Sequence, residues 1–344
     1  MSTSLYVVAS PLQMLYALEA RHEFAADKHV LCLLDTGFDY DRAQLDELAD
    51  KMSWDRVYRL PYPVKGRRIP RVLRQLILAL RIRSRFGVVD NLFSGDFNIA
   101  LNSLAEHRRF FLISDGNKIV WQHRDHGTDF VVAWTRYPRL NDCINTFFPW
   151  LKKRTWDIQY FSPFEFEDAG EWMATHHFGW LRSQIDPQRL QSQAHDTVYF
   201  LGAYLSEGVW TQYTTEAYFM TAMERIAAHY EKQGKRLIYI PHRHEDQDKL
   251  RRLQGRIPTL TFEHFERGVE LEFFYREICP THVASFVSTA LYTLPRVYDG
   301  CRCDAFQLDP DAFLPTQFWS RIKQIYDYYA DYLHVDRELL IDCG

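Results

Sequence analysis

The chain has 344 residues, 47% of them apolar and 25% charged, a composition typical of globular proteins and sufficient for two ordinary domains. A net charge of −4 and an isoelectric point near 6.4 argue against nucleic acid as the main partner. No apolar stretch approaches the roughly 18 residues of a membrane span, and Leu5–Ala9 is too short for the apolar part of a secretory signal. Six scattered cysteines without zinc spacing are typical of a reducing compartment, so we expect a cytoplasmic protein.

The first half of the chain alternates short apolar runs with helical patterns. Strands are predicted at Leu5–Ala9, Val30–Leu34, Val57–Leu60, Val88–Phe93 and Phe110–Ile113, and helices at Pro11–Phe24 and Tyr40–Lys51. Such alternation predicts a parallel, doubly wound sheet. Residues 142–193 are aromatic-rich and irregular, and we interpret them as the approach to a linker.

A second series of elements follows the polar run 192–196. Strands are predicted at Thr197–Leu201, Arg236–Ile240 and His282–Phe286, and helices at Thr215–Gln233, Asp246–Gln254, Ser288–Leu294 and Thr316–Leu333. The sequence therefore predicts an α/β protein with two Rossmann-like domains that face each other across a cleft, at 1–193 and 194–315. Residues 316–344 are expected to form a C-terminal helix that packs back on the first domain.

The sharpest feature lies where the strand Arg236–Ile240 ends, because Pro241, His242 and Glu245 follow at once. Open α/β sheets bind ligands at the carboxyl ends of their strands. His242 is therefore a candidate donor to a ligand phosphate, and Glu245 a candidate to orient an imidazole or contact a ribose. The structural alternatives are a histidine that only closes a strand end and a carboxylate that only favours the next helix.

Two hydroxyl groups and a glycine stand in corresponding places after neighbouring strands. Ser288 and Thr289 open a predicted helix, where free N–H groups and the helix dipole attract anions. Both residues are also common N-caps in any protein. Gly202 follows Thr197–Leu201 and would let the backbone approach a ligand closely, or simply end the strand.

An acidic residue ends a strand in the first half of the chain. Phe110–Ile113 is followed by Ser114, Asp115 and Gly116, and a carboxylate at this edge can act as a general base. The alternative is a plain turn, since Asp-Gly is a strong turn signal. The His/acid clusters at 242–246 and 123–129 match no zinc-hydrolase signature, and the acidic pair at 39–41 is placed to cap a helix, so no metal is expected.

No acidic residue lies between Arg56 and Val89, whereas lysine and arginine accumulate from Lys65 to Arg85. Pro70 precedes apolar residues at helical spacing, which predicts an amphipathic basic helix. Such a helix docks on anionic lipid headgroups, here at the inner-membrane surface, or is simply a solvated surface helix.

Four stretches, taken together and in order, resemble the bacterial sialyltransferases of the lipooligosaccharide sialyltransferase and polysialyltransferase type. The family's opening strand and Pro-Leu-Gln turn correspond to Tyr6–Gln13, which includes Ser10. The two-acids-then-glycine motif corresponds to Ser114–Gly116, the histidine–proline motif to Tyr239–Glu245, and the paired-hydroxyl motif to Ser288–Leu291.

The resemblance implies a GT-B glycosyltransferase that transfers a CMP-activated nonulosonic acid, such as sialic acid, to a bacterial surface glycan (lipooligosaccharide or capsule). Transfer would be inverting and would need no metal or other cofactor. In this reading His242 contacts and protonates the CMP phosphate, Ser288 and Thr289 hold it, and Asp115 is the base for the acceptor hydroxyl. The remaining expected contacts are, on the donor side, Gly202, Pro241 and Glu245, and, on the acceptor side or in turns, Ser10, Gln13 and Gly116.

Two positions depart from the family pattern. Ser114 stands where an acid usually supplies the base, and Arg243 stands where proline commonly follows the histidine. Asp115 or another acid would then have to act as the base, and Arg243 would either add charge to the phosphate site or indicate another donor. The alternatives are therefore a GT-B transferase for another nucleotide sugar and a nucleotide- or glycan-binding protein that has lost its chemistry.

Overall fold

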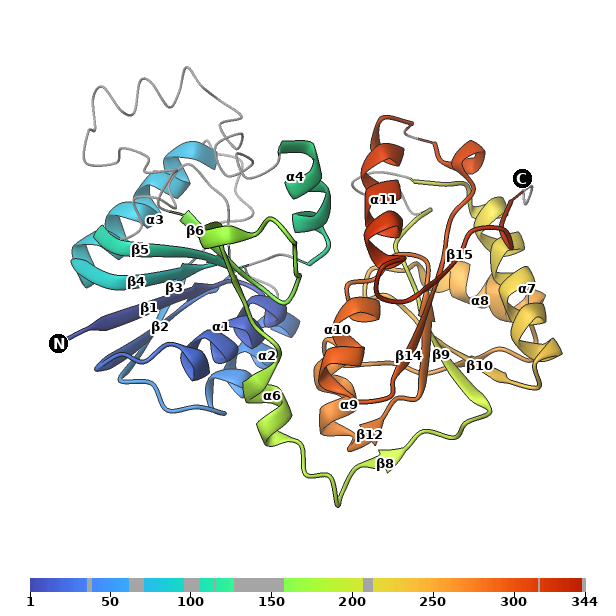
Figure 1. Cartoon of the computed structure of the whole chain (residues 1–344), viewed down its shortest axis with the longest axis horizontal. Helices are drawn as coiled ribbons and strands as arrows, with labels where there is room; N and C mark the ends of the chain where they lie inside the picture. The colour runs from blue at the N-terminus through green and yellow to red at the C-terminus, as the bar shows by residue number, and fades with distance from the viewer. Residues whose placement is uncertain are drawn as a thin grey trace. The chain divides into compact units, whose positions relative to one another are not determined.

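The computed structural model describes residues 1–35, 39–61, 71–95, 106–113, 116–126, 158–206, 213–314 and 316–341. The chain divides into two compact units, Met1–Leu181 (unit 1) and Arg182–Gly344 (unit 2). Each unit is built on its own parallel β-sheet (Figure 1).

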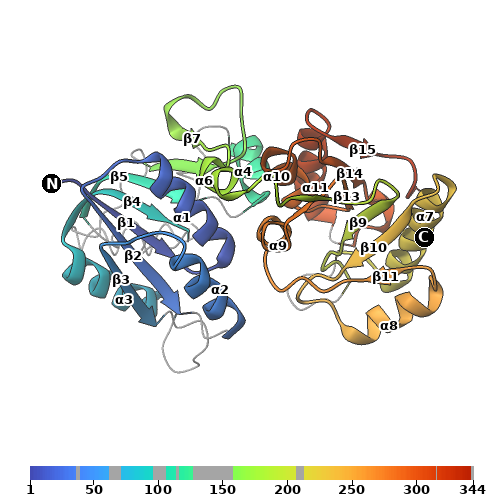
Figure 2. The ribbon, with the colours of Figure 1, turned by 90° about the horizontal axis from the view of Figure 1, so that it is seen from below.

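Unit 1 contains a seven-stranded parallel sheet in the order β3-β2-β1-β4-β5-β6-β7. Its strands are β1 (Thr3–Val8), β2 (Lys28–Asp35), β3 (Arg56–Pro61), β4 (Val88–Ser94), β5 (Glu106–Ile113), β6 (Ile158–Ser162) and β7 (Met173–Thr175). Its helices are α1 (Pro11–Glu23), α2 (Asp39–Ala49), α3 (Arg71–Phe86), α4 (Lys118–His126), the short η5 (Gly170–Trp172) and α6 (Gly179–Gln184), which crosses into unit 2. Figures 1 and 2 show α1 and α2 on one face of the sheet and α3 on the other. This is the doubly wound arrangement that right-handed crossovers produce.

Aromatic rings on adjacent strands hold the centre of the unit 1 sheet. Phe93 of β4 stacks on Tyr6 of β1 at 4.9 Å and on Phe111 of β5 at 4.6 Å between ring centroids. The strand register pairs Tyr6 with Phe93 and Phe93 with Phe111, so the three rings form a ladder on one face. All three side chains are fully buried, as expected where helices cover both faces of a parallel sheet.

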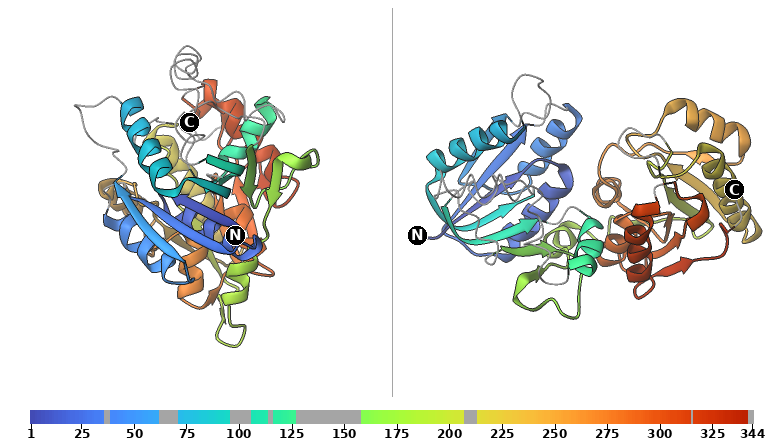
Figure 3. Two further views of the ribbon diagram at one scale, coloured as in Figure 1. Left: turned by 90° about the vertical axis from the view of Figure 1, so that its left-hand side faces the viewer. Right: turned by 90° about the horizontal axis from the view of Figure 1, so that it is seen from above.

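Unit 2 contains a six-stranded parallel sheet in the order β11-β10-β9-β13-β14-β15. Its strands are β9 (Thr197–Leu201), β10 (Arg236–Ile240), β11 (Thr261–Phe262), β13 (His282–Ser285), β14 (Arg302–Phe306) and β15 (His334–Asp336). Its helices are α7 (Glu216–Lys232), α8 (Gln247–Arg256), α9 (Val269–Tyr275), α10 (Ala290–Val297), the short η6 (Pro310–Ala312) and α11 (Thr316–Tyr329). The short β8 (Gln191–Ser192) and β12 (Ile278–Cys279) pair separately. Helices α7 and α8 lie on one face of the main sheet and α9 and α10 on the other (Figures 1 and 3).

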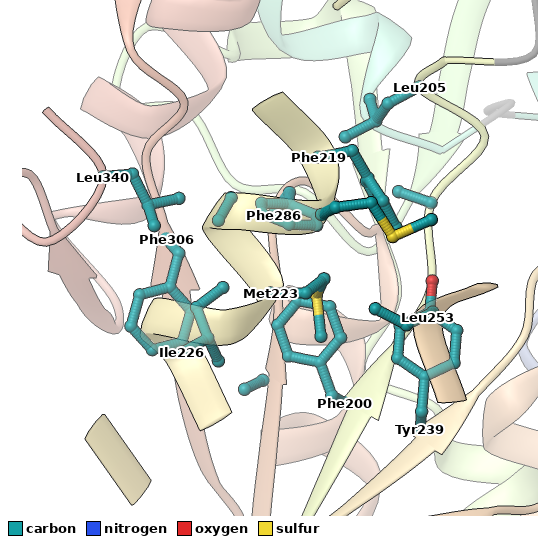
Figure 4. Close-up of a cluster of buried hydrophobic side chains, with 14 of the residues drawn as sticks. Phe200, Leu205, Phe219, Met223, Ile226, Tyr239, Leu253, Phe286, Phe306 and Leu340 are labelled. Carbon is teal, nitrogen blue, oxygen red and sulfur yellow. The ribbon is translucent and has the colours of Figure 1, made fainter. Parts of the chain in front are cut away.

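The core of unit 2 forms where α7 packs on the sheet (Figure 4). Phe200 of β9 lies at its centre, 5.8 Å from the ring of Tyr239 and 5.2 Å from that of Phe286. Met223 and Ile226 of α7 reach the same cluster. Phe200 and Tyr239 lie one residue before the ends of β9 and β10, and Phe286 directly follows β13, so the carboxyl ends of three strands are anchored in one core.

The domain boundaries differ from those expected from the sequence. The division falls between Leu181 and Arg182, earlier than the expected boundary after 193, and residues 316–344 belong to unit 2. The last strand, β15, pairs with β14, and Tyr326 of α11 donates a hydrogen bond to the Phe306 carbonyl at 3.2 Å. A terminal helix is amphipathic whichever domain it covers, so its sequence pattern does not identify its partner.

We interpreted residues 142–193 as irregular. Residues 142–157 lie outside the described residues, and 158–192 contribute β6, η5, β7, α6 and β8. The sequence analysis also missed α9, β14 and β15. These elements are short, and β14 carries charged residues at Arg302 and Asp304, so the apolar pattern that marks a buried strand is absent.

Candidate functional site at the strand ends of unit 2

The order of the strands in unit 2 reverses beside β9. From β9 the chain proceeds outward to β10 and β11, and then returns to the other side of β9 with β13 and β14. In open α/β sheets the crevice at such a reversal, at the carboxyl ends of the strands, is the usual ligand site. The segments that follow β9, β10 and β13 carry Gly202, His242 and Ser288 with Thr289.

The carboxyl ends of these three strands are level with one another. Leu201 of β9 pairs with Ile240 of β10 on one side and with Ser285 of β13 on the other. The Gly202 N–H donates to the Ile240 carbonyl at 2.8 Å, and the buried Ser285 hydroxyl donates to the Leu201 carbonyl at 2.8 Å. The structure therefore brings the expected donor-side residues to one edge of unit 2.

His242 follows β10 and the half-buried Pro241, and its side chain is exposed at this edge. The backbone N–H of His244 donates to Nδ1 of His242 at 3.3 Å, so a neutral His242 ring carries its proton on Nε2. The His242 ring lies 6.2 Å from the ring of Tyr204 and 5.4 Å from that of His244, between centroids. The rings of Tyr204 and His244 thus lie beside His242, the candidate hydrogen-bond donor to a ligand phosphate.

Glu245 lies beneath the turn rather than at its surface. One carboxylate oxygen, Oε1, lies 2.7 Å from Nζ of Lys249 and accepts the Tyr239 hydroxyl at 2.7 Å. The other, Oε2, accepts the His242 N–H at 2.7 Å. Burial raises the pKa of the Glu245 carboxyl, against the opposing effect of the Lys249 ammonium. The structure thus engages Glu245 in holding the loop; the contact to a ribose stays a prediction.

Gly202 has a structural reason to be glycine. A Cβ at this position would lie 2.3 Å from Oε2 of Glu245 and 2.7 Å from the Tyr239 hydroxyl. The missing side chain therefore makes room for the buried carboxylate that supports the His242 turn. This contact, not a close approach to a ligand, is what the structure describes.

The paired hydroxyls precede α10, which begins at Ala290 and not at Ser288 as expected. Thr289 is already helical, with φ −54° and ψ −36°, and Ser288 Oγ accepts the Ala290 N–H at 3.3 Å. Tyr329 of α11 donates to the Ser288 carbonyl at 2.6 Å and fixes this segment from the side. The N-cap of α10 is thus Thr289, whose side chain makes no capping hydrogen bond, and Ser288 Oγ satisfies the N–H of the first helical residue instead. Both half-buried residues lie at a helix N-terminus.

A buried acid lies against the first turn of α10. Thr293 donates hydrogen bonds to Glu270 Oε1 and, at 3.4 Å, to the Thr289 carbonyl. Burial raises the pKa of the Glu270 carboxyl, because desolvation disfavours its charged form. Burial thus favours the neutral form of Glu270, the form that would not repel an anion at this helix N-terminus.

In unit 1 the strand order reverses between β1 and β4, and Gln13 of α1 occupies this point. Its Oε1 accepts the Ala9 N–H at 2.8 Å, and its Nε2 donates to the Gly95 carbonyl at 2.8 Å. Ser10 caps α1 by accepting the Gln13 N–H at 3.3 Å. The residues of the Pro-Leu-Gln turn therefore join the ends of two strands.

The candidate base Asp115 lies, with Ser114, outside the described residues. Gly116 is described, and its φ of +68° is a left-handed conformation that favours glycine. Gly116 therefore has the backbone of a turn, and the roles of Asp115 and Gly116 on the acceptor side stay predictions.

Several residues of the site were not identified from the sequence: Tyr239, Lys249, Ser285 and Tyr329. Lys249 follows Glu245 by four residues, the spacing of an ion pair on a helix, so this signal was present in the sequence. Within the described ranges no three His, Cys, Asp or Glu side chains gather so as to hold a metal ion. No helix in the same ranges has the length and hydropathy to cross a bilayer.

No protein-family model matches the chain, and neither does any curated protein sequence. Among solved structures, the GT-B domain of a Photobacterium damselae sialyltransferase matches with a TM-score of 0.52 and 12% identity over 99% of both chains. A putative UDP-N-acetylglucosamine 2-epimerase from Listeria monocytogenes matches with a TM-score of 0.52 and 11% identity over 95% of this chain and 88% of that one. Staphylococcus aureus MnaA, in a co-structure with UDP, matches with a TM-score of 0.50 and 8% identity over 89% and 79%. At these identities the likeness shows the fold alone, and the chain has the GT-B fold of two Rossmann-like domains, a fold that glycosyltransferases and epimerases share.

Proposed function

We propose that the protein is an inverting, metal-independent glycosyltransferase that moves sialic acid or a related nonulosonic acid from a CMP-sugar to a bacterial surface glycan. The observation that carries the proposal is the strand reversal of unit 2. There the segments after three adjacent strands supply an exposed imidazole at His242 and a helix N-terminus with two hydroxyls at Ser288 and Thr289. Together with the GT-B fold, this chemistry fits a nucleotide phosphate.

In the proposed reaction the acceptor hydroxyl oxygen attacks the anomeric carbon of the donor as the bond from that carbon to the phosphate oxygen breaks. CMP leaves with the bonding electron pair, and the Nε2–H of His242 donates a hydrogen bond that stabilises the charge growing on the departing phosphate. Ser288, Thr289 and the N-terminus of α10 stabilise the phosphate charge. Asp115 accepts the proton of the acceptor hydroxyl. Attack from the face opposite the leaving group inverts the configuration.

Nucleotide selectivity provides the first test. We expect CMP to raise the melting temperature of the full chain more than UDP, GDP or ADP at equal concentration, with and without EDTA. A shift that EDTA abolishes would contradict the metal-independent reaction. Stabilisation by UDP alone would indicate a UDP-sugar as the donor and would leave the GT-B fold assignment unchanged.

Substitution of His242 tests the chemistry. We expect His242→Ala to lower transfer from CMP-sialic acid by about a hundredfold or more, because loss of one hydrogen-bond donor to the charge that develops in the transition state costs about 10²–10³ in rate. His195→Ala is the matched control, since this exposed histidine precedes β9 at the opposite edge of the sheet. Equal turnover of the two variants would refute the role of His242.

A second candidate donor is a UDP-sugar, which the likeness to a UDP-bound structure at a TM-score of 0.50 favours. A third reading, a binding protein without turnover, is motivated by Ser114 in place of an acid. Binding of CMP without transfer to any acceptor in a broad panel would favour that reading.

We further propose that α3 brings the protein to the cytoplasmic surface of the inner membrane. Two residues of its expected apolar face, Ile77 and Leu80, are 36% and 45% exposed. Arg81 and Arg85 are exposed on the same helix, and the surrounding sequence between Arg56 and Val89 has no acidic residue. Apolar side chains within a field of positive charge fit an anionic lipid surface.

A further inference from the structure

The turn that carries His242 rests on a buried ion pair. The side chains of Glu245 and Lys249 are 0% and 1% exposed, and their Oε1 and Nζ atoms are 2.7 Å apart. The same carboxylate accepts the Tyr239 hydroxyl and the His242 N–H, both at 2.7 Å. Lys249 Nζ also lies 3.9 Å from the centroid of the Phe219 ring. Both charged groups are thus fixed from several sides.

A buried ion pair is a poor device for stability, since the loss of hydration offsets most of its Coulombic attraction. An apolar pair of similar size would hold α8 against the core at least as well. An apolar pair could not accept the His242 N–H. That hydrogen bond is the one contact, of the three described for the Glu245 carboxylate, that reaches the backbone of the turn. The geometry therefore assigns the pair a role in placing that turn.

Two further hydrogen bonds connect the turn to the imidazole ring. The Glu245 N–H donates to the His242 carbonyl at 2.8 Å and closes the turn. The His244 N–H donates to Nδ1 of His242 at 3.3 Å. This second bond forms only while the turn brings the backbone N–H of His244 to Nδ1 of His242, and it makes Nδ1 an acceptor.

We propose that Glu245 and Lys249 are positioning residues that fix the orientation of His242 and the tautomer whose proton is on Nε2. Neither residue touches the nucleotide; they act through the backbone of residues 242–245. The consequence for catalysis rests on the proposed function, because it requires a hydrogen bond from Nε2–H of His242 to the phosphate of the CMP-sugar. The structural statement about the tautomer stands independently of any substrate.

The test uses two double variants of the full chain. Glu245→Leu with Lys249→Met removes both charges and the acceptor for the His242 N–H. Glu245→Gln with Lys249→Met also removes both charges but keeps a side-chain carbonyl at that position. Because neither pair leaves a lone buried charge, we expect both to melt within a few degrees of wild type. Should the leucine variant fail to fold, Tyr239→Phe removes one bond to the same carboxylate and is expected to show a smaller change of the same kind.

The first readout is ¹⁵N NMR of histidine-labelled protein without ligand, with the His242 signals assigned by His242→Gln. We expect wild type and the glutamine variant to show one tautomer with the proton on Nε2, and the leucine variant to show averaged shifts. The second readout is steady-state kinetics, where we expect the leucine variant to lose about tenfold to a hundredfold in kcat with a smaller change in KM.

A leucine variant with wild-type ¹⁵N shifts would overturn the positioning role. Failure of the proposed function looks different, because CMP would then not stabilise the wild-type protein, whereas the tautomer would still respond to the variants. A large fall in kcat with unchanged ¹⁵N shifts would also contradict the proposal, since it would mean that the pair acts by another route than His242.

Discussion

Gly202 and Gly95 each stand where another side chain fills the space of a Cβ. At Gly95 that neighbour is the Gln13 amide, and at Gly202 it is the Glu245 carboxylate. Both glycines follow a strand at a point where the strand order reverses. In this protein the two positions are therefore reserved for buried polar side chains that join strand ends.

Gly202→Ala should destabilise the protein by about 1–3 kcal/mol, because the new methyl group overlaps a carboxylate that several bonds prevent from moving. Urea unfolding followed by circular dichroism measures the change. The control is Gly255→Ala in α8, where a Cβ meets nothing within 4 Å, and it should be neutral or stabilise by about 0.5–1 kcal/mol. A Gly202→Ala protein as stable as the control would refute the packing explanation.

His176 in unit 1 is fully buried, and neither ring nitrogen has a hydrogen-bond partner among the described residues. Its ring stacks on Phe161 with centroids 4.7 Å apart. Burial lowers the pKa of this imidazole from 6.5 to about 3. Below pH 6.5 His176 is protonated in the unfolded chain but stays neutral in the folded chain. The contribution of neutral His176 to the free energy of unfolding is therefore fully present above pH 6.5 and is lost as the pH falls toward 3.

Leucine is similar in size to histidine and does not titrate, so His176→Leu should remove this pH-dependent contribution to stability. Between about pH 6.5 and pH 4 the wild-type protein should lose about 3 kcal/mol more than the variant, since each pKa unit corresponds to about 1.4 kcal/mol. Urea unfolding at several pH values gives the two curves. His195→Leu changes an exposed histidine and should leave the pH dependence as in wild type. Parallel curves for His176→Leu and wild type would contradict the argument.

At the scale of elements, the sequence was most informative where polar residues follow a strongly apolar strand. The strands β9 and β10 are strongly apolar, and β13 has an apolar centre, Val283 and Ala284. Gly202, His242 and Ser288 follow these three strands, so both the elements and the residues after them were predictable. The strand β14 was missed because Arg302 and Asp304 interrupt the apolar pattern. Asp304 is accommodated there by contacts with His282 at 2.6 Å and Tyr230 at 3.0 Å, which come from distant parts of the chain.

The role of Glu245 was only partly predictable for the same reason. The local spacing to Lys249 favours an ion pair, and the sequence analysis allowed that Glu245 orients an imidazole. Burial of the pair depends on Gly202 and Phe219, which lie on other elements and can be related to it only in three dimensions. Tertiary packing thus decides whether a helix-spaced pair is a solvated surface feature or the support of a turn.

The helix α3 allows a direct test of the proposed membrane contact. We expect the protein to co-sediment with vesicles of phosphatidylcholine and phosphatidylglycerol at low salt, and binding to fade as salt rises. Replacing both Ile77 and Leu80 with serine should weaken binding by removing the apolar contact, and Arg81→Gln should weaken it by about fivefold, or about 1 kcal/mol.

Leu314→Ser is the control, because this leucine is 51% exposed but lies in unit 2. Vesicles of phosphatidylcholine alone should bind little of any variant. Binding that depends on neither salt nor lipid charge would contradict the proposed contact. So would an equal loss of binding in Leu314→Ser and in the α3 variants, and α3 would then be a solvated surface helix.

At the scale of the whole molecule, the two units use the same topological feature in different ways. The reversal point in unit 1 is bridged by Gln13, whose amide joins the ends of β1 and β4. The reversal point in unit 2 instead presents the N-terminus of α10 and His242, whose turn is held by the buried Glu245. If the proposed function is correct, this difference favours unit 2 as the nucleotide-binding half and unit 1 as the acceptor side.

Hydrogen exchange of the full chain can locate nucleotide binding to one unit. With CMP we expect slower exchange in peptides that cover 198–206, 238–248 and 284–294, where backbone groups at three strand ends would meet the phosphate. A ligand slows exchange only in the parts of a protein whose opening also releases that ligand. If the units open independently, amides of β1 and β2 should therefore exchange at the same rate with and without CMP. Equal slowing throughout both sheets would mean that the units open together, and slowing confined to unit 1 would move the nucleotide to the other half and refute the site at His242.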